Sequence, residues 1–124
     1  MTTKSILLID DEPNLAQVIA VCLETFKGWN VRVVNSGKEG LKLLETINPD
    51  AIVLDVMMPE MDGLTVFSHL QQNINTQNIP TILLTAKMQV SDRARFSQLG
   101  VAGVISKPFD PLKIADEISA ILKW

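Results

Sequence analysis

Side chains that can bind metals, accept a transferred group or donate hydrogen bonds follow short apolar runs in this 124-residue sequence. Each run has the composition of a buried strand. Strands of a parallel sheet share one carboxyl edge, and ligands bind at that edge in open α/β proteins. If the runs belong to one sheet, the side chains that meet there are Asp10, Asp11, Asp55, Thr85 and Lys107.

The chemistry expected of this collection is phosphoryl transfer assisted by a divalent cation. Carboxylates of Asp10, Asp11 and Asp55 held within a few ångströms would repel one another, and a bound cation relieves that repulsion. Oxygen ligands without His or Cys favour a hard ion such as Mg²⁺. A carboxylate can act as a nucleophile that forms an acyl phosphate. A cation, Lys107 and Thr85 would then offset the charge on the phosphoryl oxygens.

Five β-rich runs are the elements that would position these side chains. Amphipathic segments separate them, so the sequence alternates between strand and helix patterns. Such alternation predicts an α/β fold, with a parallel sheet, helices on both of its faces and right-handed crossovers. The predicted strands cover residues 5–9, 31–34, 51–55, 79–85 and 103–106.

The first predicted helix begins near Pro13, which suits the first helical turn, and ends at Gly28. Its apolar residues recur at helical spacing, so they are expected to form the buried side. These residues are Leu15, Val18, Ile19, Cys22 and Phe26.

Capping signals place the remaining helices. Ser36 and Glu39 have the spacing of a capping box, and the helix that they open is expected to continue until Pro49. Asp110 and Pro111 are expected to open the last helix. Two further helices are expected over about 64–70 and over 90–99.

The composition restricts the classes of protein to which the chain can belong. A net charge of −3 and a pI near 5.0 argue against a general nucleic-acid surface. Apolar runs stay well below the ~18 residues of a membrane span, and the first residues lack a secretory signal. The single Cys22 fits a reducing cytoplasm and is expected to be a small buried hydrophobe. The length suits one domain, residues 1–124.

Taken in order along the chain, these motifs resemble the receiver domains of two-component response regulators. The resemblance runs from Ile6 to about Leu122 and implies a flavodoxin-like (βα)5 three-layer sandwich with strand order 2-1-3-4-5. Because the chain ends soon after the last predicted helix, we expect a stand-alone receiver without an effector domain. The matching segments are LLIDDE at 7–12, IVLDVMMP at 52–59, MDG at 61–63, LTA at 84–86 and KPF at 107–109.

The resemblance implies that Asp55 is the phosphoacceptor and that Mg²⁺ is the cofactor. Asp11 would bind Mg²⁺ directly, and Asp10 would help, largely through water. The acceptor Asp55 and the backbone carbonyl of Met57 would complete the protein ligands.

The resemblance also implies how the phosphoryl group is held and where it comes from. Thr85 would hydrogen-bond the phosphoryl group, and Lys107, followed by a cis peptide bond to Pro108, would pair with it. The donor would be a histidine kinase or a histidine phosphotransfer protein. The output would be a contact between an unknown downstream protein and the face made by the fourth helix, the fifth strand and the fifth helix, without turnover of a separate substrate.

Three positions depart from the family pattern. Val104 stands where receivers commonly carry Tyr or Phe, so we expect the switch to depend on the loop after the fourth strand and on the following helix. Met57 offers only a thioether near the acceptor, which predicts slow hydrolysis of the phosphorylated form. Ala102 and Gly103 replace an acid that supports dimers in one large subfamily, so that dimer is disfavoured.

Other interpretations of the same residues remain open. Asp10 and Asp11 could simply cap a helix, and Asp55 could be a turn residue. The chain could be a receiver-like adaptor that is never phosphorylated. It could also be a phosphohydrolase with an aspartyl nucleophile, although such enzymes usually carry a second acid at the position of Met57. His69 is expected at the surface, outside the site.

Overall fold

The computed structural model describes residues 3–86 and 90–124. Within these ranges, β-strands and α-helices alternate along the chain and the strands form one parallel sheet in the order β2-β1-β3-β4-β5. This confirms the predicted fold class and strand order. The strands are β1 (Ser5–Ile9), β2 (Asn30–Val34), β3 (Ala51–Asp55), β4 (Thr81–Thr85) and β5 (Gly103–Ser106). The helices are α1 (Pro13–Lys27), α2 (Gly37–Leu43), α3 (Gly63–Gln72), α4 (Val90–Gln98) and α5 (Ile114–Leu122).

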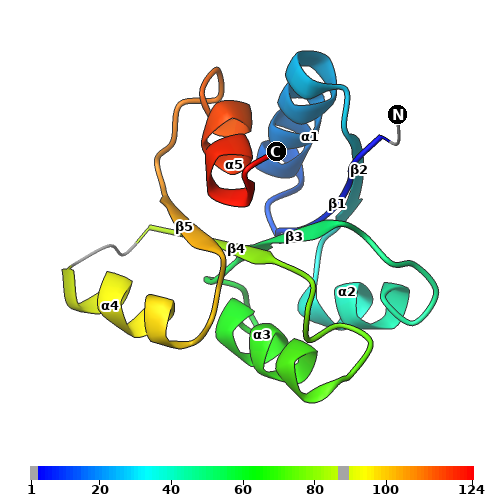
Figure 1. The fold of residues 1–124 in the computed structure, drawn as a ribbon, viewed down its shortest axis with the longest axis vertical. Coiled ribbons are helices and arrows are strands. Elements are labelled where there is room, and N and C mark those ends of the chain that lie inside the picture. The colour runs from blue at the N-terminus through cyan, green and yellow to red at the C-terminus, as the bar shows by residue number, and fades with distance from the viewer. Residues whose placement is uncertain (1–2, 87–89) are drawn as a thin grey trace.

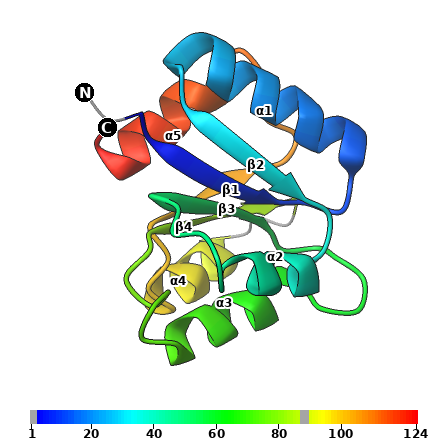
Figure 2. The same ribbon diagram turned by 90° about the vertical axis from the view of Figure 1, so that its right-hand side faces the viewer.

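Helices cover both faces of the sheet, as expected for right-handed crossovers between parallel strands. Helices α1 and α5 lie together on one face, and α2, α3 and α4 lie on the other (Figures 1 and 2). Within the described ranges of the chain, no helix is long and apolar enough to cross a membrane.

The central strands supply two hydrophobic cores because successive side chains point to opposite faces of the sheet. Leu8 packs in one core with Ile19 of α1 and Ile118 of α5. Its neighbour Leu7 packs in the other core with Phe67 of α3. A strand covered on both faces must be apolar along its length, so polar side chains appear where the strands end.

The register of the sheet brings those strand ends to one level. Ile9 pairs with Leu54, which places the next residues, Asp10 and Asp55, side by side at the carboxyl edge. Thr85 ends the neighbouring strand β4 one residue beyond the partner of Asp55. The predicted gathering of polar side chains is therefore a consequence of strand pairing.

The buried side of α1 differs from the predicted one. Val18 and Phe26 are 43% and 51% exposed, so their assignment to the buried side was wrong. Small residues allow α1 to approach the sheet closely, and the fully buried positions are Ala16, Ile19, Ala20 and Leu23. Cys22 is half-buried against the same core, close to its predicted role.

Helix α2 ends at Leu43, well before the predicted end at Pro49. The backbone N–H groups of Glu45 and Thr46 donate to carbonyls three residues earlier, which tightens the chain into a turn. The Thr46 hydroxyl also donates to the Leu43 carbonyl and competes with further helix. The cap at the other end is confirmed, because Ser36 Oγ accepts the Glu39 N–H.

Two other boundaries also shift. Strand β4 begins at Thr81 and not at Ile79, because Pro80 has no N–H to donate to a ladder. Helix α5 begins at Ile114, since Asp110 opens a separate turn before it. The Asp110 side chain accepts the N–H of Leu112, and its carbonyl accepts the N–H of Ile114.

Gly63, the first residue of α3, lies against the strand that carries Asp55, and a Cβ there would contact the Asp55 carbonyl oxygen and stand 2.8 Å from the Val56 Cα. Because backbone must move to make room, we expect Gly63→Ala to lower the free energy of unfolding by about 2–3 kcal/mol in urea titrations. Gly28→Ala is the control: the left-handed φ of 68° at Gly28 costs about 1 kcal/mol, but no atom lies within 4 Å. Equal losses in the two variants would contradict the steric explanation.

Candidate phosphoryl-transfer site

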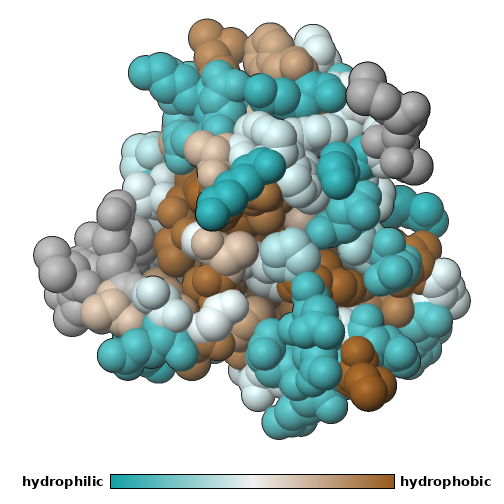
Figure 3. Space-filling model, viewed as in Figure 1, coloured by the Kyte–Doolittle hydropathy of each residue, from teal (hydrophilic) through white to brown (hydrophobic). Residues whose placement is uncertain are grey.

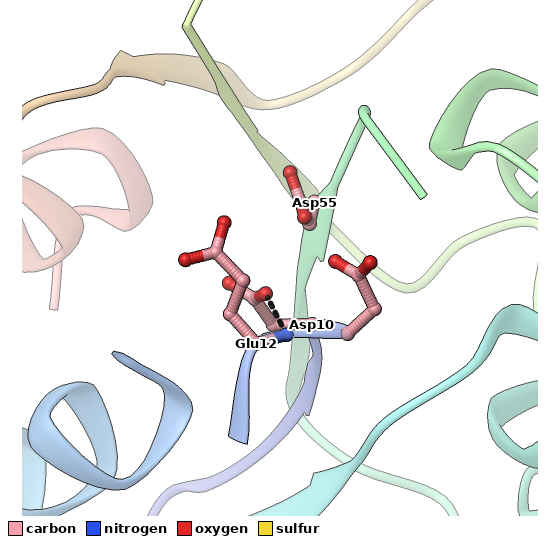
Figure 4. A group of neighbouring side chains, drawn as sticks. Asp10, Glu12 and Asp55 are labelled. Carbon is pink, nitrogen blue, oxygen red and sulfur yellow. Dashed lines mark hydrogen bonds between the residues drawn. The ribbon is translucent and has the colours of Figure 1, made fainter. Parts of the chain in front are cut away.

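Four carboxylates lie together at the carboxyl edge of the sheet. Asp10 and Asp11 follow β1, Glu12 precedes α1, and Asp55 ends β3. Figure 4 shows the side chains of Asp10, Glu12 and Asp55. One oxygen from each lies within 4.8 Å of the others. Lys107, which follows β5, brings an ammonium group into the same cluster. The structure therefore brings the acidic residues predicted from the sequence into one site with Lys107.

Asp55 is buried at the centre of this site, with 1% of its surface exposed. Its Oδ1 lies 3.3 Å from Lys107 Nζ and accepts the Met57 N–H at 3.3 Å. Its Oδ2 has no hydrogen-bond partner among the described residues. Burial, and then the negative charge of Asp10, raise the pKa of Asp55 to about 6, although Lys107 acts in the opposite direction.

Lys107 is held where it can neutralise more than one carboxylate. Its backbone N–H donates to the Thr85 carbonyl at 2.8 Å, and the bond to Pro108 is cis, as the resemblance implied. Its Nζ lies 3.3 Å from Asp55 and 3.6 Å from Asp10. Burial works to lower the pKa of the ammonium group, but Asp10 and then Asp55 outweigh it, so the pKa of Lys107 is raised and the group stays charged.

Asp10 is fully buried, and hydrogen bonds hold both its backbone and its side chain. Asn35, after β2, donates its side-chain amide to the Asp10 carbonyl at 3.1 Å. The Asp10 Oδ1 accepts the Glu12 N–H at 2.9 Å, which turns the carboxylate toward the site. Burial is the main reason that the pKa of Asp10 is raised, partly offset by that hydrogen bond and by Lys107.

The site has the donor set of a hard cation. Asp11 is half-buried, and its Oδ1 lacks a hydrogen-bond partner among the described residues, as do Oδ2 of Asp10 and Oδ2 of Asp55. Buried carboxylate oxygens without partners are costly unless something else satisfies them. Because one oxygen from each carboxylate lies within 4.8 Å of the others and no His or Cys belongs to the cluster, the residues present fit Mg²⁺.

Other residues singled out in the sequence lie around this site or away from it. Thr85 is buried at the end of β4, level with Ser106 at the end of β5. Val104 is half-buried against the core under α2, α3 and α4. The switch expected from Val104 involves residues 87–89, which lie outside the described residues. His69 is exposed on α3, as expected for a residue outside the site.

Glu12 is the member of the cluster to which sequence reasoning gave no role. Its carboxylate Oε1 lies 3.8 Å from Lys107 Nζ. The signal was available, because Glu12 directly follows the two aspartates. A residue at a helix start is readily interpreted as a cap, yet the Glu12 side chain makes no capping hydrogen bond.

Comparisons with known proteins agree with this geometry. A family model of the response regulator receiver domain matches residues 6–119. The alkaline phosphatase synthesis transcriptional regulatory protein PhoP of Bacillus subtilis is 38% identical over 120 residues, which is 97% of this chain and 49% of PhoP. The chain spans about half the length of the curated relatives it matches, and these relatives are regulators by name, not enzymes that turn over a separate substrate.

Solved structures agree as well. The receiver domain of a Francisella response regulator superposes with a TM-score of 0.87 at 30% identity and covers 98% of both chains. The receiver domain of a Pseudomonas aeruginosa sensor histidine kinase, crystallised with a magnesium ion coordinated in its active site cleft, superposes with a TM-score of 0.84 at 27% identity and covers 99% of this chain and 100% of its own. The chain therefore belongs to the receiver-domain family of two-component response regulators, whose members act as phosphorylation-based switches.

Proposed function

We propose that this chain accepts a phosphoryl group on Asp55 from a histidine kinase or a histidine phosphotransfer protein, with Mg²⁺ bound beside the acceptor. The observation that carries the proposal is the Asp55 carboxylate itself: one oxygen faces Lys107 at 3.3 Å, and the other is buried without a hydrogen-bond partner among the described residues. A nucleophile needs such a free oxygen. The magnesium ion in the Pseudomonas aeruginosa receiver domain supports the same use of this edge.

Each residue of the site has a distinct part in this proposal. Asp55 attacks the phosphorus atom, while Lys107 pairs with a phosphoryl oxygen and Thr85 donates a hydrogen bond to another. Asp10, Asp11, Asp55 and the backbone carbonyl of Met57 would hold Mg²⁺. The bound ion would supply positive charge that lowers the repulsion among the carboxylates and stabilises the charge on the phosphoryl group.

The output that we propose is a protein contact through the face formed by α4, β5 and α5, in the cytoplasm and without direct binding of nucleic acid. Two apolar residues in or next to these elements are within reach of solvent: Val104 on β5 is half-buried, and Leu99, which directly follows α4, is 43% exposed. Hydrophobic side chains also gather near the middle of the view in Figure 3, between the two helix layers. Phosphorylation would bias two conformations of this region.

Phosphorylation of Asp55 can be measured directly with acetyl phosphate. We expect Mg²⁺-dependent incorporation of one phosphoryl group in the wild type and none in Asp55→Asn, read by phosphate-affinity electrophoresis and intact-mass spectrometry. Asp116→Asn removes an exposed carboxylate on α5 and should label like the wild type. Labelling of Asp55→Asn, or labelling that survives EDTA unchanged, would refute the proposal.

The raised pKa of Asp55 predicts a pH-dependent stability in the metal-free protein. The pKa of the Asp55 carboxyl is about 6 in the folded state and 3.8 in the unfolded state. Its contribution to the free energy of unfolding is therefore fully present below pH 3.8 and is lost as the pH rises through 6. In EDTA, between pH 4 and pH 8, the unfolding free energy of Asp55→Asn should therefore gain about 2–3 kcal/mol relative to the wild type. Saturating Mg²⁺ at pH 8 should remove most of that gain. A pH-independent difference in urea titrations would contradict ionisation of the buried Asp55 carboxyl as the cause.

The lifetime of the phosphorylated form should depend on Met57, which is 56% exposed and whose backbone N–H donates to Asp55 Oδ1. A thioether is a poor hydrogen-bonding group and cannot orient an attacking water, whereas an amide can. We expect Met57→Asn to hydrolyse its phosphoryl group roughly threefold to tenfold faster than the wild type. Met57→Leu keeps an apolar side chain at this position, so its phosphorylated form should hydrolyse at the wild-type rate after the donor is removed. Slower decay in Met57→Asn would count against this role.

A further inference from the structure

Glu12 differs from the other carboxylates of the site in its exposure. Its side chain is 62% exposed, whereas Asp10 and Asp55 are almost completely buried. Figure 4 shows its carboxylate beside that of Asp10, facing Asp55 across the site. Its Oε1 lies 3.8 Å from Lys107 Nζ. Glu12 is thus a negative charge at the solvent side of a site whose other charges are largely enclosed.

A cleft of about 350 Å³ opens beside Glu12 and Lys107. Its remaining wall includes the apolar side chains of Leu15, Phe109 and Pro111. In an in-line displacement at Asp55, the leaving group departs on the side of the phosphorus atom away from the acceptor, toward solvent. The cleft shares Glu12 and Lys107 with the site, so a donor whose leaving group extends from the site into the cleft would bring that group near the Glu12 carboxylate.

The backbone of Glu12 is fixed independently of its side chain. Its N–H donates to Asp10 Oδ1 at 2.9 Å, and its carbonyl accepts the Ala16 N–H at 2.9 Å in the first turn of α1. The side chain makes no capping hydrogen bond. Replacement of the Glu12 carboxylate by an amide would therefore change the charge at the solvent side of the site without removing the backbone hydrogen bonds that hold this part of the chain.

We infer that Glu12 is a specificity-determining residue that favours phosphoryl donors with a P–N bond over acyl phosphates. The inference rests on the proposed phosphorylation of Asp55. With a P–N donor, an Asp55 oxygen forms the new O–P bond, the P–N bond breaks, and its electron pair stays on the nitrogen. The leaving group departs neutral, because an amine nitrogen already carries its protons and an imidazole carries a proton on its other ring nitrogen. With an acyl phosphate, the P–O bond breaks and the electron pair leaves on a carboxylate.

The charge of Glu12 acts on these two leaving groups with opposite signs. The positive charge of a protonated amine or imidazole leaving group is attracted to the carboxylate, whereas the developing negative charge on an acyl oxygen is repelled by it. Because Glu12 is exposed, solvent screens the interaction and the effect on rate is moderate, about threefold to tenfold in the ratio of the two rates. Any effect of Glu12 on Lys107 or on the bound cation applies to both donors and cancels in that ratio.

The experiment measures the second-order rate constants for phosphorylation by phosphoramidate and by acetyl phosphate, at fixed Mg²⁺ and ionic strength, for the full chain. In Glu12→Gln, the ratio of the phosphoramidate rate to the acetyl phosphate rate should fall about threefold to tenfold, and Glu12→Lys should lower it further. Glu24→Gln, which removes a charge from a later turn of α1, is the matched control and should leave the ratio unchanged. High salt should shrink the effect of Glu12→Gln.

The possible failures can be told apart. If phosphoramidate and acetyl phosphate both label the wild type but the ratio is the same in Glu12→Gln, or both rates fall equally, the role of Glu12 is refuted and the proposed function stands. If neither donor labels the wild type on Asp55, the proposed function and this inference fail together. A ratio that rises in Glu12→Lys would also overturn the inference, because it would reverse the sign of the electrostatic effect.

Discussion

The contact between the Lys107 ammonium group and the carboxylates of Asp55 and Asp10 is the interaction on which the site depends. Both carboxylates are almost completely buried, and each has one oxygen without a hydrogen-bond partner among the described residues. Without a nearby cation, burial would drive such groups to the neutral form. Lys107, at 3.3 Å and 3.6 Å, supplies only part of the compensation, because one positive charge faces more than one negative charge. A bound cation would offset the remaining deficit of positive charge.

The rest of the fold keeps that electrostatic conflict in place. The register of β1 and β3 sets Asp10 beside Asp55, and the packing of Leu7 and Leu8 into separate cores holds the strand between two helix layers. Asn35 ties the Asp10 carbonyl to the end of β2. The apolar cores stabilise the fold, whereas the charged edge destabilises it because it buries carboxylate oxygens that lack hydrogen-bond partners in the part of the chain that the structure describes. Functional sites commonly contain such locally unfavourable features. The apolar middles of the strands thus stabilise the fold, and the polar residues at their carboxyl ends form the site.

Much of this arrangement could be predicted from the sequence, for physical reasons. Strands buried on both faces are continuous apolar runs. The order of residues was therefore enough to predict β1, β3 and the polar residues at their carboxyl ends. Helix faces and ends were less predictable. Val18 has the right spacing for the buried side of α1, but close packing against the sheet selects small residues such as Ala16 and Ala20. The early end of α2 depends on the Thr46 hydroxyl, a local competition that periodicity does not reveal.

Within the site, predictability follows burial. Backbone pairing places the buried Asp10 and Asp55 and the half-buried Lys107, so their convergence follows from the topology. Glu12 lies where a side chain can turn either toward the site or toward solvent, and only the structure shows that its carboxylate is 3.8 Å from Lys107. Such exposed border positions can change without loss of the fold, because they contribute little to either core. In the roles proposed above, Glu12 and Met57 can therefore be changed with little effect on the fold, whereas the enclosed groups are constrained by both packing and charge. Different physical effects therefore determine what the two kinds of residue can do. The cost of desolvation limits the enclosed residues, whereas screened electrostatics and the access of water limit the exposed residues at the border of the site.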